Sequence, residues 1–159
     1  MFSFCKKKFD VEISEISEVK IYGFSKKSND KTIAKDIHEL SVKFYGIMNK
    51  KPVIPYFILS KNYDIKTKDF EMFIGSIYEN TLFTQYIIPE GKYAKITVRP
   101  KLGFMWGLSI GEAKRYFYTI WLKNSKYEPL NMEYEYHTEK SIGKKPAIDI
   151  LFSISDKWR

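Results

Sequence analysis

Hydrophobic and polar positions repeat one pattern twice along the chain: a strand, then an amphipathic helix, then two more strands. The first copy covers about residues 9–78 and the second about residues 82–155. Matching the two helices gives an offset of about 75 residues, which places Phe57 opposite Glu133. The pattern predicts an α+β fold in which two similar modules form a single domain, residues 1–159, with a cleft between the modules.

The first copy has clear elements. Apolar residues alternate with polar ones between residues 11 and 24, which predicts a strand. Between residues 33 and 47 they recur at every third or fourth position, the spacing of one face of a helix. Pro52 ends this helix, and strands are expected at residues 56–60 and 70–78.

In the second copy, the helix is expected to begin near Ser109, because Ser109 and Glu112 have the spacing of a capping box. Trp106 would then lie in the preceding loop, where a large aromatic side chain fits either a wall or lid of a site or packing against the core. The strands of this copy are expected at residues 82–88, 93–98, 132–137 and 147–154. The apolar stripe expected to face the core is formed by Ile110, Ala113, Phe117, Ile120 and Trp121.

Composition excludes several classes of protein. Hydrophobic residues make up 44% of the 159 residues, enough for a core, and no apolar stretch approaches the ~20 residues of a membrane-spanning helix. The net charge of +8 comes from lysines scattered beside turns, whereas a nucleic-acid groove concentrates them on one face.

The single cysteine, Cys5, and a start without a signal-peptide pattern favour the cytoplasm. Two isolated histidines predict no metal site, and no cofactor motif is present.

Three segments resemble motifs of the GyrI-like small-molecule-binding domain, which is also the effector-binding half of drug-sensing transcription activators. Its YxxWLPxSGY motif resembles residues 118–128 (YTIWLKNSKYE), although lysines replace the Pro and the Gly. Its PxGxYA strand resembles residues 89–94 (PEGKYA), and its acidic, aromatic strand ending in Gly resembles residues 69–75 (DFEMFIG). The order and spacing of the segments match over most of the chain.

The FExY motif of that family has two possible registers here. It fits residues 134–137 (YEYH) better than residues 132–135 (MEYE), so Glu135 is the preferred match. Because alternate residues of a strand share a face, Glu133 would point to the same side in either register.

The resemblance implies two modules related by a pseudo-two-fold axis, with a ligand cleft between their helices. It also implies that the cleft binds hydrophobic, cationic aromatic small molecules, because a carboxylate fixes the sign of the ligand and aromatic faces attract positive charge. The expected ligand-binding residues are Glu135, Glu133, Trp106, Tyr118, Trp121, His137 and Phe57. The residues alone leave it open whether the two glutamates face water and whether Trp121 belongs to the core.

Three hypotheses follow. The first is a stand-alone sensor or sequestering protein without catalytic residues, whose partners are small molecules and neither nucleic acid nor membrane. The second is a hydrolase of electrophilic small molecules, in which Glu135 activates water. The third is a protein-interaction module that inhibits a nucleic-acid enzyme.

Overall fold

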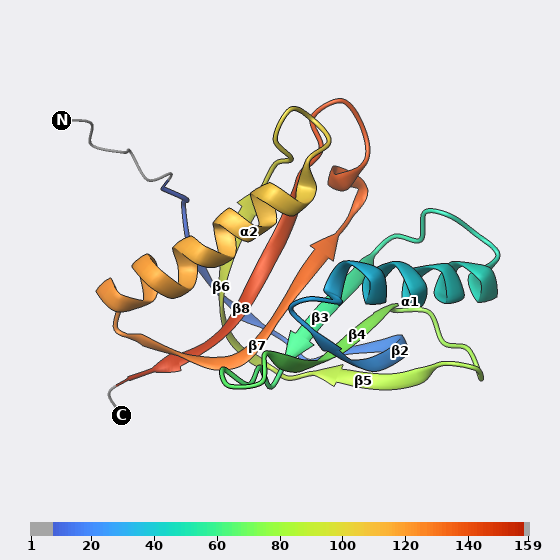
Figure 1. Ribbon diagram of the computed structural model, residues 1–159, viewed down its shortest axis with the longest axis horizontal. Coiled ribbons are helices and arrows are strands. Elements are labelled where there is room, and N and C mark those ends of the chain that lie inside the picture. The colour runs from blue at the N-terminus through green and yellow to red at the C-terminus, as the bar shows by residue number, and fades with distance from the viewer. Residues whose placement is uncertain (1–7, 158–159) are drawn as a thin grey trace.

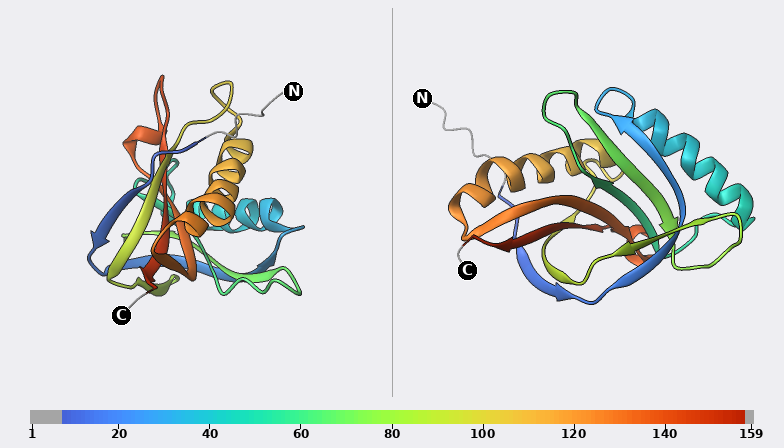
Figure 2. Two further views of the ribbon diagram at one scale, coloured as in Figure 1. Left: turned by 90° about the vertical axis from the view of Figure 1, so that its left-hand side faces the viewer. Right: turned by 90° about the horizontal axis from the view of Figure 1, so that it is seen from below.

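The computed structural model describes residues 8–157 and has two helices on one face of a curled, eight-stranded antiparallel sheet (Figures 1 and 2). The strands are β1 (Glu12–Ile16), β2 (Val19–Asn29), β3 (Tyr56–Lys61), β4 (Asp69–Ser76), β5 (Thr84–Ile88), β6 (Gly91–Val98), β7 (Tyr127–His137) and β8 (Ile148–Asp156). The helical segments are α1 (Ile33–Met48), α2 (Trp106–Tyr116), the π-helix η1 (Phe117–Trp121) and the short 3₁₀ helices η2 (Leu122–Asn124) and η3 (Glu139–Ser141). The predicted α+β fold with two main helices is confirmed.

The order of the strands shows the duplication directly. The sheet runs β1-β6-β8-β7-β3-β4-β2-β5, so β3 and β7 pair at its centre and each continues outward through two strands of its own module. The outermost strand of each module pairs with the other module: β1 of the first module pairs with β6, and β5 of the second module pairs with β2. The single strand expected between residues 11 and 24 is therefore wrong: it consists of two strands that lie far apart in the sheet.

The two faces of the sheet are both covered by apolar side chains. On one face, α1 packs against β2 and β4 through Leu40 and Phe44, while α2 lies over β6 and β8 (Figure 1). On the other face, alternate residues of the central strands, including Leu59 and Tyr134, form a separate core. This alternation decides which side chains of β3 and β7 face the helices.

The helix α2 begins at Trp106, before the predicted capping box. Ser109 is fully buried inside the helix, and its hydroxyl accepts a hydrogen bond of 2.9 Å from the backbone amide of Lys101. The expected capping box is therefore wrong, because the hydroxyl satisfies an amide of the preceding loop and not one at the start of the helix. Trp106 is consequently part of the helix and not of the loop.

The helix changes its winding at Phe117. Ala113 and Phe117 are buried, as predicted, but the next buried position is Leu122 and not Ile120. The spacing of five between Phe117 and Leu122 is that of a π-helix, whose hydrogen bonds join residues i and i+5. The wider turn keeps both side chains on the sheet.

Candidate functional site

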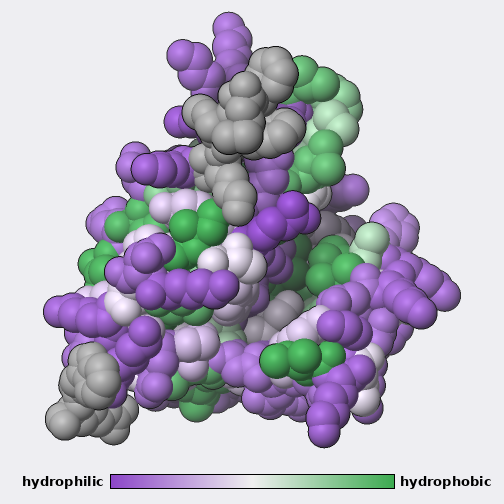
Figure 3. Space-filling model, turned by 60° about the vertical axis from the view of Figure 1, so that its left-hand side comes forward, coloured by the Kyte–Doolittle hydropathy of each residue, from purple (hydrophilic) through white to green (hydrophobic). Residues whose placement is uncertain are grey.

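A cavity of about 610 Å³ lies between the N-terminal end of α1 and the second half of α2, beside β3 and β7. In Figure 3 the surface is hollowed between the two halves of the molecule, and hydrophobic side chains line the recess. The apolar and aromatic lining residues are Ile33, Tyr63, Ile65, Phe70, Tyr118, Pro129 and Met132. The charged lining residues are Asp30, Lys61, Lys114, Arg115 and Glu133. A concave, mostly apolar site with a few converging polar groups is typical of small-molecule binding.

Both glutamates of β7 point toward the helices. In the register of β7 with β3, Glu133 lies opposite Ser60 and Glu135 lies opposite Ile58. Tyr134, between the two glutamates, points to the other face and packs in the core there. The period of two in the strand thus places both carboxylates on the side of the sheet that carries the cleft.

Glu133 is held by two residues one helical turn apart. The hydroxyl of Tyr118 donates a hydrogen bond of 2.9 Å to Oε1, and Nζ of Lys114 lies 3.0 Å from Oε2. Burial raises the pKa of Tyr118, and the charge of Glu133 raises it further. Burial would lower the pKa of Lys114, but the attraction of Glu133 and Glu135 outweighs this effect, so the pKa is raised. Both residues therefore keep their protons, and the carboxylate stays between them with only 14% of its side chain exposed.

Glu135, the carboxylate preferred from the sequence, lies further along β7. Its Oε1 is 3.4 Å from Nε2 of His137, and its side chain is 11% exposed. The ring of His137 packs edge-on against Tyr56, whose hydroxyl shares a hydrogen bond of 2.6 Å with Ser41 of α1. Glu135 and His137 thus form a pair beside the core beneath α1, while Glu133 lines the cavity.

The remaining aromatic candidates lie outside the cavity lining. Trp106 and Trp121 pack against the core beneath α2, where Trp121 stacks on Phe117 at 5.4 Å and on Tyr127 at 5.8 Å between ring centroids. The structure also corrects the placement of Phe57, which is buried in the core on the other face of the sheet. The repeat offset aligned Phe57 with Glu133 along the chain, but the two residues have opposite parity in the pairing of β3 with β7.

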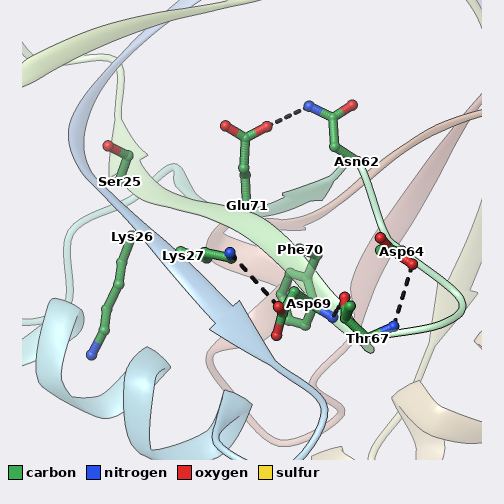
Figure 4. A pocket seen from close by; sticks show the side chains of 9 residues that line it. All are labelled: Ser25, Lys26, Lys27, Asn62, Asp64, Thr67, Asp69, Phe70 and Glu71. Carbon is green, nitrogen blue, oxygen red and sulfur yellow. Dashed lines mark hydrogen bonds and ion pairs between the residues drawn. The ribbon is translucent and has the colours of Figure 1, made fainter.

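A second hollow, of about 550 Å³, lies beside β2 and β4, where the loop of residues 62–68 approaches (Figure 4). Its polar side chains bind one another: Nζ of Lys27 lies 3.7 Å from Asp69, and Asn62 donates a hydrogen bond to Glu71. Because these groups are already paired, the hollow is a weaker candidate for a ligand site than the apolar cavity.

Two further properties concern residues 8–157. In that range no three His, Cys, Asp or Glu side chains are grouped so that they could hold a metal ion. None of the helices found there combines the length and the apolar character needed to cross a membrane.

Solved structures of other proteins share this architecture. An integron cassette protein from the mobile metagenome of Vibrio cholerae superposes with a TM-score of 0.66 at 16% identity, over 91% of this chain and 95% of that chain. SAV2435 bound to tetraphenylphosphonium gives a TM-score of 0.67 at 9% identity, over 92% and 94% of the two chains. The C-terminal domain of EcmrR gives 0.60 at 16% identity, over 93% and 98%. The fold is GyrI-like.

The GyrI-like fold was predicted from short motifs. No protein-family model matches the chain, and no curated protein does. The structural similarity at 9–16% identity establishes the fold and leaves the ligand to be inferred from the residues of this cavity.

Several residues that line the cavity of this GyrI-like fold were not recognised in the sequence. Lys114 lies in the cavity lining although it is not part of the apolar stripe expected from the sequence; its spacing of four from Tyr118 was a signal that both share a face of the helix. Tyr63 and Phe70 reach the cavity from the loop after β3 and from β4. Their contribution depends on how the loop folds back, for which the sequence carries no periodic pattern.

Proposed function

We propose that this protein binds hydrophobic, cationic aromatic small molecules in the cavity, with Glu133 as their counter-ion. The observation that carries the proposal is a mostly buried carboxylate in the wall of an apolar cavity of about 610 Å³. Pockets of about 300–1,000 Å³ suit ligands of drug size. A carboxylate inside such a pocket favours a ligand that brings positive charge.

Magnitudes assign different roles to the glutamate and the aromatic residues. An ion pair at ~4 Å is worth about 4 kcal/mol at an effective dielectric constant near 20, before desolvation is subtracted. A contact between a cation and an aromatic ring contributes about 0.5–2 kcal/mol. Glu133 would therefore select the charge of the ligand, while Tyr63, Phe70 and Tyr118 would select its aromatic surface.

A similar structure supports this class of ligand. SAV2435, which shares the fold over 92% of this chain, was solved with tetraphenylphosphonium, a cation that carries four aromatic rings. That ligand combines the hydrophobic surface and the positive charge that the lining of the present cavity would accommodate. It is therefore the natural first probe for this protein.

The test is a calorimetric titration of tetraphenylphosphonium into the wild type and two variants. We expect Glu133→Gln to weaken binding by about tenfold or more, because about 1.4 kcal/mol of lost attraction corresponds to a factor of ten. Glu135→Gln is the matched control: it makes the same change two residues along β7, outside the cavity lining, and should change the affinity by less than about threefold. Equal affinities of the wild type and Glu133→Gln would refute the role of Glu133.

A second candidate function is hydrolysis of electrophilic small molecules, and one observation favours it. Glu135 and His137 lie 3.4 Å apart in a largely buried position, an arrangement in which a carboxylate and an imidazole can activate water. Incubation with reactive electrophiles, followed by mass spectrometry, would reveal hydrolysed products. Loss of those products in Glu135→Gln but not in Glu133→Gln would support hydrolysis, and intact compounds in every reaction would speak against it.

The proposal also concerns partners and location. Small molecules would be the partners, because the cavity combines apolar walls with charges of both signs and has no continuous basic face. We propose a cytoplasmic location, in which the single cysteine of the chain would stay reduced. That residue, Cys5, lies outside the described part of the structure. Fractionation of cells that express the protein, with immunodetection, tests the location.

A further inference from the structure

The carboxylate proposed to attract a cationic ligand already has a cation beside it. Nζ of Lys114 lies 3.0 Å from Oε2 of Glu133, inside the lining of the same cavity. Oε2 is buried and faces this ammonium group, while Oε1 accepts a hydrogen bond from Tyr118. The ammonium group of Lys114 therefore already takes the position beside Glu133 in which the positive charge of a ligand would be most stable.

We propose that Lys114 is a specificity determinant of the cavity, an internal cation that competes with a cationic ligand for Glu133 and thereby limits how tightly such ligands bind. The inference rests on the proposed function, since it concerns the same cavity and the same carboxylate. It adds a second charge that decides which ligands are accepted.

Lys114 remains charged in this position. Its pKa is raised, because the attraction of the neighbouring carboxylates outweighs the effect of burial. A ligand cation that approaches Glu133 thus meets a like charge at contact distance, where repulsion is strong at the low effective dielectric constant of a partly buried site. Deprotonation of Lys114 would cost free energy, because its pKa is raised. Movement of its side chain away from Glu133 would break the ion pair.

Two other acidic residues also attract the charge of Lys114. Glu135 and Asp30 both contribute attraction to its ammonium group, and Asp30 lines the cavity on the side of α1. Displacement of Lys114 from Glu133 is therefore costly but not prohibitive. Cationic ligands would still bind, more weakly than in a cavity that has the carboxylate alone.

The inference predicts opposite effects on two probes of the same shape. Tetraphenylphosphonium and tetraphenylborate have nearly the same size and aromatic surface but carry charges of opposite sign. Hydrophobic contacts contribute alike to both, so the ratio of their affinities reports the electrostatics of the cavity. Lys114 should disfavour the cation and favour the anion.

The experiment measures the dissociation constants of both probes for the wild type, Lys114→Met, Glu133→Gln and the double variant Lys114→Met/Glu133→Gln. We expect Lys114→Met to bind tetraphenylphosphonium about tenfold more tightly and tetraphenylborate several-fold more weakly than the wild type. In the double variant the gain for the cation should disappear, because no carboxylate is left for it to pair with. Lys123→Met is the matched control, since Lys123 is exposed on η2 and lies outside the cavity lining.

The outcomes separate the two proposals. If Lys114→Met and Lys123→Met have the same effect on both probes, the role of Lys114 is refuted, whatever Glu133→Gln does. If Glu133→Gln binds tetraphenylphosphonium as well as the wild type, the role of Glu133 as counter-ion in the proposed function is refuted. Thermal unfolding without ligand is measured for each variant, and Lys114→Gln replaces Lys114→Met if the methionine variant does not fold.

Discussion

Phe117 fixes the π-helix to the sheet, and its replacement by alanine provides a quantitative test of this arrangement. The side chain is fully buried, and its ring stacks on Phe152 with 3.9 Å between centroids and 10° between planes. It also contacts Trp121 at 5.4 Å. Removal of a buried phenylalanine costs about 3–5 kcal/mol, and the loss of a close aromatic stack favours the upper part of that range. This is a large share of the about 5–15 kcal/mol that stabilises a typical domain.

The assay is equilibrium unfolding in urea, followed by circular dichroism. With a slope of about 1–3 kcal/mol per molar urea, we expect Phe117→Ala to lower the midpoint by about 1.5 M or more without changing the slope. Thr119→Ala, an exposed position in the same π-helix, should change stability by less than about 0.5 kcal/mol. A loss below about 1 kcal/mol in Phe117→Ala would refute the conclusion that this contact anchors the segment.

The variant also tests the link between the core and the cavity. The ring of Tyr118 packs edge-on against Phe117 at 4.9 Å and against Phe152 at 5.5 Å, while its hydroxyl binds Glu133. We therefore expect Phe117→Ala to bind tetraphenylphosphonium more weakly, in addition to being less stable. The affinity is measured at a temperature below the unfolding transition of the variant. Unchanged affinity would show that Tyr118 keeps its position without this support.

Two further predictions concern stability. Asp36 binds Lys26 at 2.7 Å, and mainly this contact lowers the pKa of Asp36 to about 2. Its ionised form therefore stabilises the fold above the usual pKa of 3.8, and this contribution is lost as the pH falls through 2. The urea midpoint of Asp36→Asn should accordingly be lower than that of the wild type near neutral pH. It should also fall less than the wild-type midpoint between pH 4 and pH 2. Parallel curves of midpoint against pH would contradict the stabilising role of ionised Asp36. Gly75→Ala should destabilise the protein severely, because its Cβ would overlap the carbonyl oxygen of Tyr22, whereas Gly46→Ala, with open space on the exposed side of α1, should stabilise it by about 0.5–1 kcal/mol in the same urea assay. Similar effects of the two glycine substitutions would refute the close approach of β2 and β4.

The sequence was informative wherever a local pattern extends over several turns or strand residues. The helix near residues 33–47 was predicted almost to its ends, since α1 spans Ile33–Met48. The pairing of both glutamates on one face of β7 also followed from the sequence alone, because the direction of side chains along a strand depends only on parity. The motifs at residues 69–75, 89–94 and 118–128 indicated the fold that the structure has.

Local patterns failed where one segment depends on a distant one. The local spacing of Ser109 and Glu112 predicts a helix cap, but the hydroxyl of Ser109 accepts a hydrogen bond from the backbone amide of Lys101, which lies in the preceding loop. The split of the first strand into β1 and β2 depends on pairing with β6, more than 70 residues away. Likewise, the assignment of Phe57 to the cleft depended on a repeat offset, which does not determine the register between β3 and β7.

By itself, therefore, the sequence determined the two modules, their helices and the presence of both carboxylates on one side of a strand, since these properties depend on neighbours within a few residues. Only the tertiary structure decided that Glu133 lines the cavity, that His137 packs against Tyr56 of β3 and that Lys114 forms an ion pair with Glu133. Those relations join β7 to α2 and to the other module. They are set by how whole elements pack together, and packing between elements leaves no periodic signal along the chain.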